Sequence, residues 1–152
     1  MNQTQYNKVL KARNLVVKSF DVYKVPAPYQ NVILEAFDSG LSGEWDIYNM
    51  DGCTFINDYW VNKFSPSCTP HDYHSRTGRG GWLANRLMTE INKCYALPSR
   101  AVNFRLIMTT IGHYGFFGIR DFVLKKQKNY TPIMIKALIY YKKNGKLNTY
   151  KN

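Results

Sequence analysis

The sequence SCTPHDYHSR at residues 67–76 precedes a glycine-containing break and a second helical pattern at residues 82–95. Residues three or four apart share one face of a helix, so Cys68, His71 and either His74 or Ser75 can line one surface. This spacing places a titratable base, an acid and a soft metal ligand within one or two helical turns. The stretch is therefore typical of a catalytic site, a metal site or the polar centre of a small core.

Apolar side chains recur at helical spacing in other parts of the chain. In residues 82–95, Leu83, Leu87 and Ile91 fall on one stripe. Thr131 followed by Pro132 is typical of a helix start, because threonine caps a first turn and proline suits the first helical position. The predicted helices cover residues 3–17, 66–76, 82–95 and 100–114, and a last helix opens at residue 131 and ends within residues 142–145.

Three segments of about seven residues between turn signals are predicted to be strands. The first is followed by Pro26 and Pro28, the second by an Asp-Ser-Gly turn and the third by Asp51-Gly52. The segments are residues 19–25, 31–37 and 44–50. The predicted fold class is therefore α+β, a small N-terminal antiparallel sheet followed by a cluster of helices.

The 152 residues fit one domain with its own hydrophobic core. We expect the core at about residues 20–121, with basic extensions at residues 1–18 and 122–152. No apolar run approaches the ~20 residues of a membrane span, so no span is predicted. Three cysteines, an odd number, indicate free thiols in a reducing compartment, with one bridge plus one free thiol as the alternative.

The formal charge of +11 is concentrated at the two ends of the chain. Four basic residues and no acidic one precede Asp21, and eight lysines and no acid follow Asp121. Basic ends favour a negatively charged partner, either an acidic surface or nucleic acid, although lysine-rich ends can simply aid solubility. Lysine is a point charge, which suits loose docking better than reading of bases. The candidate partner-binding residues are Lys125, Lys126, Lys128, Lys142, Lys143 and Lys146.

His71 is the candidate general base, because histidine titrates close to neutral pH. Asp72 is the adjacent candidate acid, but on a helix it points about 100° away from its neighbour. Asp51, at a predicted strand end, is the preferred residue to orient His71. The alternative is a structural role, with His71 buried and Asp72 at the helix start.

Other chemistries at this stretch are less favoured. Zinc would need paired ligands at both ends of the site, and only one half is visible around Cys68, His71 and His74. Nothing local marks Cys68 or Cys94 as an activated nucleophile. No metal or other cofactor is therefore predicted.

Cys68-x-x-His71-Asp72, followed by a helix and Cys94, resembles the catalytic helix of secreted calcium-dependent phospholipases. The match covers about thirty residues, without the family's calcium loop or cysteine framework. The resemblance implies that His71 activates water.

A longer stretch resembles an uncharacterised domain family of tailed bacteriophages. The matching motifs occur in the family's order over roughly residues 20–120, and the resemblance implies a phage setting. They are Asp51-Gly52-Cys53-Thr54, His71-Asp72-Tyr73, Ala84-Asn85-Arg86-Leu87-Met88, and an aromatic segment from Arg105 through Gly112 to Phe117. Asn85 stands where the family carries an acid, which argues against hydrolysis if that acid belongs to the site.

Three functions remain open. The favoured one is a virion assembly component of the neck, tail or interior. It would be made in the host cytoplasm, located in the virion, homo-oligomeric, and bound to other virion proteins through its basic termini. The alternative is a small hydrolase that acts on lipid, peptide or cell-wall substrates, with His71 as base and Asp51 orienting it. A nucleic-acid-associated protein is the third, on charge alone.

Overall fold

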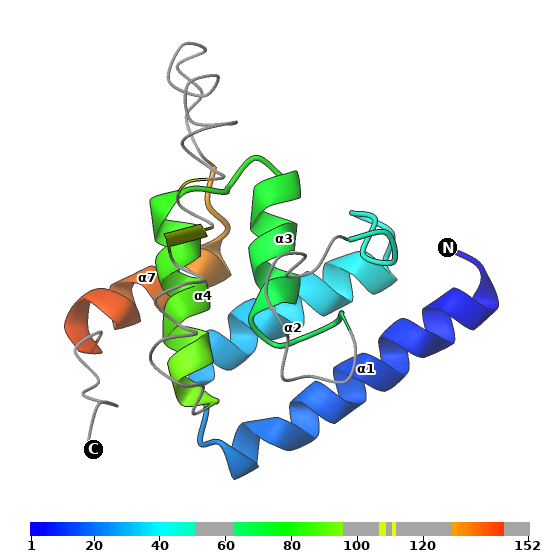
Figure 1. Ribbon diagram of the computed structural model, residues 1–152, viewed down its shortest axis with the longest axis horizontal. Coiled ribbons are helices and arrows are strands. Elements are labelled where there is room, and N and C mark those ends of the chain that lie inside the picture. The colour runs from blue at the N-terminus through cyan, green and yellow to red at the C-terminus, as the bar shows by residue number, and fades with distance from the viewer. Residues whose placement is uncertain (51–62, 96–106, 109–110, 112–128, 145–152) are drawn as a thin grey trace.

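The computed structural model describes residues 1–50, 63–95, 107–108, 111 and 129–144. Within these ranges the regular elements are all helices (Figure 1). They are α1 (Gln3–Val22), α2 (Ala27–Leu41), α3 (Cys68–Arg76), α4 (Trp82–Cys94) and α7 (Pro132–Asn144). Ile107, Met108 and Ile111 are also helical and fall within the predicted helix at residues 100–114, whose other residues lie outside the described ranges.

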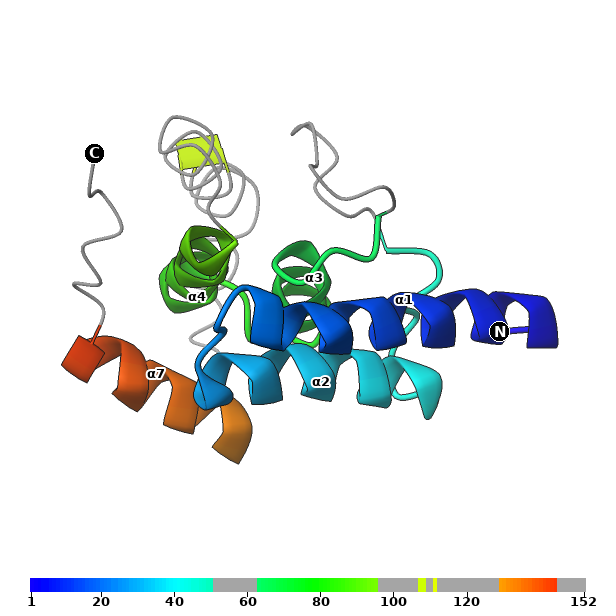
Figure 2. The ribbon, with the colours of Figure 1, turned by 90° about the horizontal axis from the view of Figure 1, so that it is seen from below.

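Helix α2 is the centre of the arrangement. It lies beside α1 in a helical hairpin and also contacts α3 and α7, while α4 packs against α3 and α7 (Figure 2). One side of this helix is buried, and five of its side chains have no exposed surface. These are Tyr29, Val32, Ile33, Ala36 and Phe37. Helices α1, α3 and α7 therefore pack around the apolar side of α2.

The prediction of an α+β fold is wrong, because the three predicted strand segments contain no strand. Residues 31–37 belong to α2, and their buried side chains recur at helical spacing. The short apolar run Val32-Ile33-Leu34 resembles a strand in sequence, because a run of this length does not distinguish a strand from part of a helix. Pro26 and Pro28 are at the cap and in the first turn of α2, where proline starts a helix rather than ending a strand.

The other two strand predictions fail for different local reasons. Helix α1 continues through residues 19–22, and it ends where Lys24 adopts a left-handed φ of 49° and Val25 N–H donates to the Phe20 carbonyl. Residues 42–50 form turns, held to α2 by the Trp45 indole, which donates to the Ala36 carbonyl at 2.8 Å.

The ends of the helices follow ordinary capping chemistry. Asn2 and Gln5 form a reciprocal capping box at the start of α1. The Thr131 hydroxyl accepts from Met134 N–H at the start of α7, as the Thr-Pro pair predicts. A bidentate ion pair of Arg13 with Asp38, with a shortest separation of 2.6 Å, joins α1 to α2.

The predicted absence of a membrane span agrees with the structure as far as it is described. None of the helices in the described ranges has the length and apolar character needed to cross a bilayer.

Candidate functional site on helices α3 and α4

Helices α3 and α4 lie side by side and are joined at one end by residues 77–81 (Figure 1). The Thr77 hydroxyl donates to the Tyr73 carbonyl at 2.6 Å and closes the end of α3. Gly78, with a φ of +77°, then turns the chain, because this conformation strains residues that carry a Cβ. The two helices are thus a tight hairpin, so side chains on their facing surfaces come from residues only 10–20 apart in sequence.

Each helix of the pair buries an apolar side against the core. Tyr73 on α3 lies with its ring 5.6 Å from that of Trp45, and α4 buries Leu87 and Ile91. This packing fixes the rotation of both helices about their axes. The polar residues of the α3–α4 interface are therefore held on a rigid scaffold.

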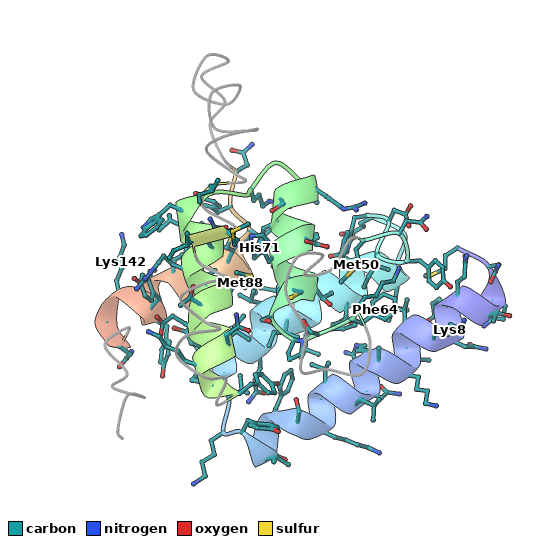
Figure 3. All side chains as sticks on the ribbon, in the orientation of Figure 1. Lys8, Met50, Phe64, His71, Met88 and Lys142 are labelled. Carbon is teal, nitrogen blue, oxygen red and sulfur yellow. The ribbon has the colours of Figure 1, made fainter. Side chains whose placement is uncertain are left out.

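His71 and Asn85 meet across this interface. His71 lies on α3 in the region next to α4 (Figure 3). Its Nε2 atom is 2.8 Å from the Oδ1 atom of Asn85 on α4. An amide oxygen only accepts hydrogen bonds, so Nε2 of the neutral ring carries the proton. The Nδ1 atom is then the nitrogen with the free lone pair, which is the atom that can accept a proton from a substrate or a water.

The carboxylate of Asp72 lies near that lone pair. Its Oδ1 atom lies 3.8 Å from Nδ1 of His71, which is too long for a hydrogen bond but close for a charge interaction. The side chains of His71 and Asp72 are 17% and 13% exposed. The centre is therefore mostly buried but reachable from one side.

His74, one turn after His71, lies deeper in the same helix. Its side chain is buried, and its Nε2 atom has no hydrogen-bond partner among the residues that the structure describes. Burial, together with the nearby charges of His71 and Arg79, lowers the pKa of His74 to about 3. His74 is thus a neutral core side chain rather than a second base.

The described ranges include some of the site residues predicted from the sequence and leave out others. His71 and Asp72 lie together on α3, whereas Asp51 lies outside the described residues. Lys142 and Lys143 are exposed in the last turn of α7. The other four candidate lysines (Lys125, Lys126, Lys128 and Lys146) also lie outside the described ranges. The residue that sequence reasoning missed is Asn85 as the partner of His71. The resemblance to the phage family draws attention to position 85, but no local spacing in the sequence pairs it with His71.

The thiols of the described residues do not supply a nucleophile. Cys68 is disulfide-bonded, and Cys94 is a free thiol. Burial and the adjacent charge of Glu90 raise the pKa of Cys94 to about 11, so it is a protonated thiol at neutral pH. A bridged Cys68 and a free Cys94 agree with the alternative prediction of one disulfide bridge plus one free thiol.

A second polar group lies on the opposite side of α4. The buried carboxylate of Glu90 is 2.9 Å from Lys93 Nζ and 3.9 Å from Arg86 Nη2. Arg86 also donates from Nε to the Tyr141 hydroxyl at 3.0 Å, which ties α4 to α7. These contacts pair a buried charge, so they belong to the packing of the helices.

Metal binding has no geometric support in the described residues, where no three His, Cys, Asp or Glu side chains converge as metal ligands. Comparisons of the chain with protein-family models, with curated proteins and with solved structures found no match. The resemblances to the phage family and to the phospholipases stay predictions.

Proposed function

We propose that the chain is a small hydrolase in which His71 is the general base, and that its substrate is a lipid, peptide or cell-wall component. The hydrogen bond between His71 and Asn85 carries this proposal, because it orients the ring and leaves Nδ1 unprotonated. Asparagine does this without a charge. The loss of an acid at position 85 therefore removes a charge from the site but not the orienting contact.

The chemistry follows from the positions of the two ring nitrogens. A water that donates to Nδ1 of His71 gives up its proton as its oxygen attacks an ester or amide carbon. The ring becomes an imidazolium, and the Asp72 carboxylate 3.8 Å away stabilises that charge. The ring then returns the proton from Nδ1 to the leaving group. Water is the nucleophile in this scheme, since Cys68 is bridged and the Cys94 thiol is not activated.

Hydrolysis by the purified full-length chain tests the proposal. The probes are p-nitrophenyl esters, phosphatidylcholine vesicles, a denatured protein and peptidoglycan. On any probe that is turned over, we expect His71→Gln to lower kcat by about 10²–10⁴-fold, because general-base catalysis is lost. Ser75→Ala is the matched control, because Ser75 is on the same helix and is exposed.

Two outcomes would contradict the hydrolase proposal. One is the absence of turnover on all four probes. The other is a turnover that His71→Gln leaves unchanged. Either result would assign the His71–Asn85 contact a structural role, as a polar tie between α3 and α4.

A second candidate is the virion assembly component, in which the chain binds neighbouring copies or other virion proteins. The observation that favours it is the outer face of α7, where Ile135 and Ile139 are 44% and 49% exposed and Lys142 and Lys143 follow. Exposed aliphatic side chains beside charges are typical of subunit contacts. Quantitative mass spectrometry of purified phage particles tests it, with a fixed number of copies per portal or tail ring as the expected result. Absence from the particles would rule it out.

A further inference from the structure

The outer face of α1 carries a continuous row of basic and aliphatic side chains. Positions three and four residues apart share a helix face, and five such positions in α1 are all exposed. We call them the α1 stripe: Lys8, Lys11, Leu15, Lys18 and Val22. At 1.5 Å per residue the stripe is about 21 Å long.

The stripe faces away from the rest of the described molecule. The adjoining side of α1 buries Val9, Ala12 and Val16, and Arg13 is turned towards α2, where it pairs with Asp38. Figure 1 shows α1 along the lower edge of the molecule. The stripe therefore has the position of a contact surface, and its side chains do not contribute to the core.

The charge of the stripe has one sign. Asp21 is the one acid in α1, and it lies three residues after Lys18, beside the end of the stripe. The three lysines outnumber this single acid, so the face keeps a positive charge that attracts an anionic surface. The partner is thus polyanionic, and the remaining question is whether it is a lipid surface, a nucleic acid or an acidic protein.

The aliphatic members of the stripe distinguish these partners. Val22 is 74% exposed and Leu15 is 46% exposed, and they alternate with the lysines. A phosphate backbone is bound by lysines and gives Leu or Val no apolar contact. An anionic bilayer uses both kinds of side chain, because lysines meet the headgroups while aliphatic groups enter the acyl boundary.

We infer that the α1 stripe docks the protein on the surface of a membrane that contains anionic lipids, with α1 lying in the plane of the interface. This surface contact does not depend on hydrolysis at His71. It is also distinct from a membrane span, since α1 contacts the bilayer from outside through five side chains.

Co-sedimentation of the full chain with vesicles tests the inference. The probes are phosphatidylcholine vesicles with and without phosphatidylglycerol. We expect binding to the anionic vesicles only, and a loss of about 100-fold in K8Q/K11Q/K18Q, the effect of three lysines at an anionic surface. L15S/V22S should lower binding by about tenfold through lost apolar contact. H71Q should bind like the parent chain.

The matched control is I135S/I139S, which removes two equally exposed aliphatic side chains from α7. Three results would overturn the inference. The first is the absence of binding to anionic vesicles. The second is an equal loss of binding in the α1 and α7 aliphatic variants. The third is that only the lysine variant weakens binding and duplex DNA binds as tightly as the vesicles, which would identify a general polyanion site.

Discussion

The Nε2 atom of His71 donates to the Oδ1 atom of Asn85 over 2.8 Å, and this bond links α3 to α4. The two residues are separated by a turn and lie fourteen positions apart. The bond makes the ring's tautomer a structural property of the hairpin, which can be measured whether or not a substrate is known.

We therefore expect a long-range ¹H–¹⁵N NMR spectrum to show neutral His71 with its proton on Nε2. Asn85→Leu should give a mixture of the two tautomers and destabilise the protein by about 1–3 kcal/mol, because a buried hydrogen bond is lost. Asn85→Asp should keep the tautomer, and any hydrolytic rate should rise, since a second carboxylate would stabilise the imidazolium. A single tautomer that persists in Asn85→Leu would show that another contact orients the ring.

The free energy of unfolding should decrease as the pH is lowered, because of His74. Its pKa is about 3 in the folded protein against an ordinary value of 6.5. Between these values the unfolded chain binds a proton that the folded chain does not, so stability is complete above about 6.5 and decreases as the pH falls towards 3. The loss is at most about 1.4 kcal/mol per pH unit.

Urea denaturation from neutral pH down to about pH 4 checks this window. Carboxylates also protonate at the acid end, so the comparison is between the parent chain and His74→Phe, which fills the site without a titrating group. The free energy of unfolding of the parent chain, measured relative to that of His74→Phe, should decrease steadily as the pH falls. A constant difference over the whole range would show that His74 is not the group responsible.

Much of the helical structure could be predicted from the sequence, because α1, α3, α4 and α7 each have an apolar stripe or a recognisable cap. Helix α2 was not predicted, since the seven-residue window at 31–37 is too short to show its period, although Asn31, Glu35 and Asp38 form a polar face along the whole helix. Pro26 and Pro28 added to the error, because the same residue type ends a strand and starts a helix. Only tertiary packing distinguishes the two cases.

The replacement of Gly40 by alanine should destabilise the protein. A Cβ atom at this position would lie 2.6 Å from both Cβ and Cγ2 of Ile47, within the turn that covers α2. Alanine gains about 1 kcal/mol in helix propensity over glycine, but overpacking typically costs about 1–3 kcal/mol. We expect the clash to dominate and the urea midpoint to fall.

Gly40→Ala combined with Ile47→Ala tests part of this contact. Because the double variant removes Cγ2 and Cδ1 of Ile47 but keeps its Cβ, the clash is only partly relieved, and the cost should be somewhat smaller than the sum of the two single costs. A higher midpoint in Gly40→Ala alone would mean that residues 42–47 can move away from α2 without loss.

The candidate site was predictable in part. His71 and Asp72 stood out from their residue types, because a histidine beside an acid on a short helix is chemically conspicuous. The role of Asn85 could not be predicted from the sequence, since its partner is set by the way α3 folds back on α4 rather than by any local spacing. Asp51 was preferred to orient the ring, while Asn85 holds Nε2 in the structure.

The hydroxyl of Thr131 has two partners that join α7 to α2. It accepts from Met134 N–H at 3.2 Å and donates to the Glu35 carboxylate at 2.9 Å. Burial raises the pKa of Glu35, and the bond from Thr131 opposes that rise. Thr131→Val keeps the shape but removes both contacts, so we expect a loss of about 1–2 kcal/mol in unfolding free energy at neutral pH.

Thr131→Ser is the control, because it retains the hydroxyl and should stay close to the parent chain. The pKa of Glu35 should rise further in Thr131→Val, which makes the valine variant relatively more stable as the pH falls and Glu35 binds its proton. Glu35→Gln removes the charge that needs the donor, so Thr131→Val should cost less in that background than in the parent chain. Equal costs in both backgrounds would mean that the cap at Met134, and not the bond to Glu35, accounts for the whole effect.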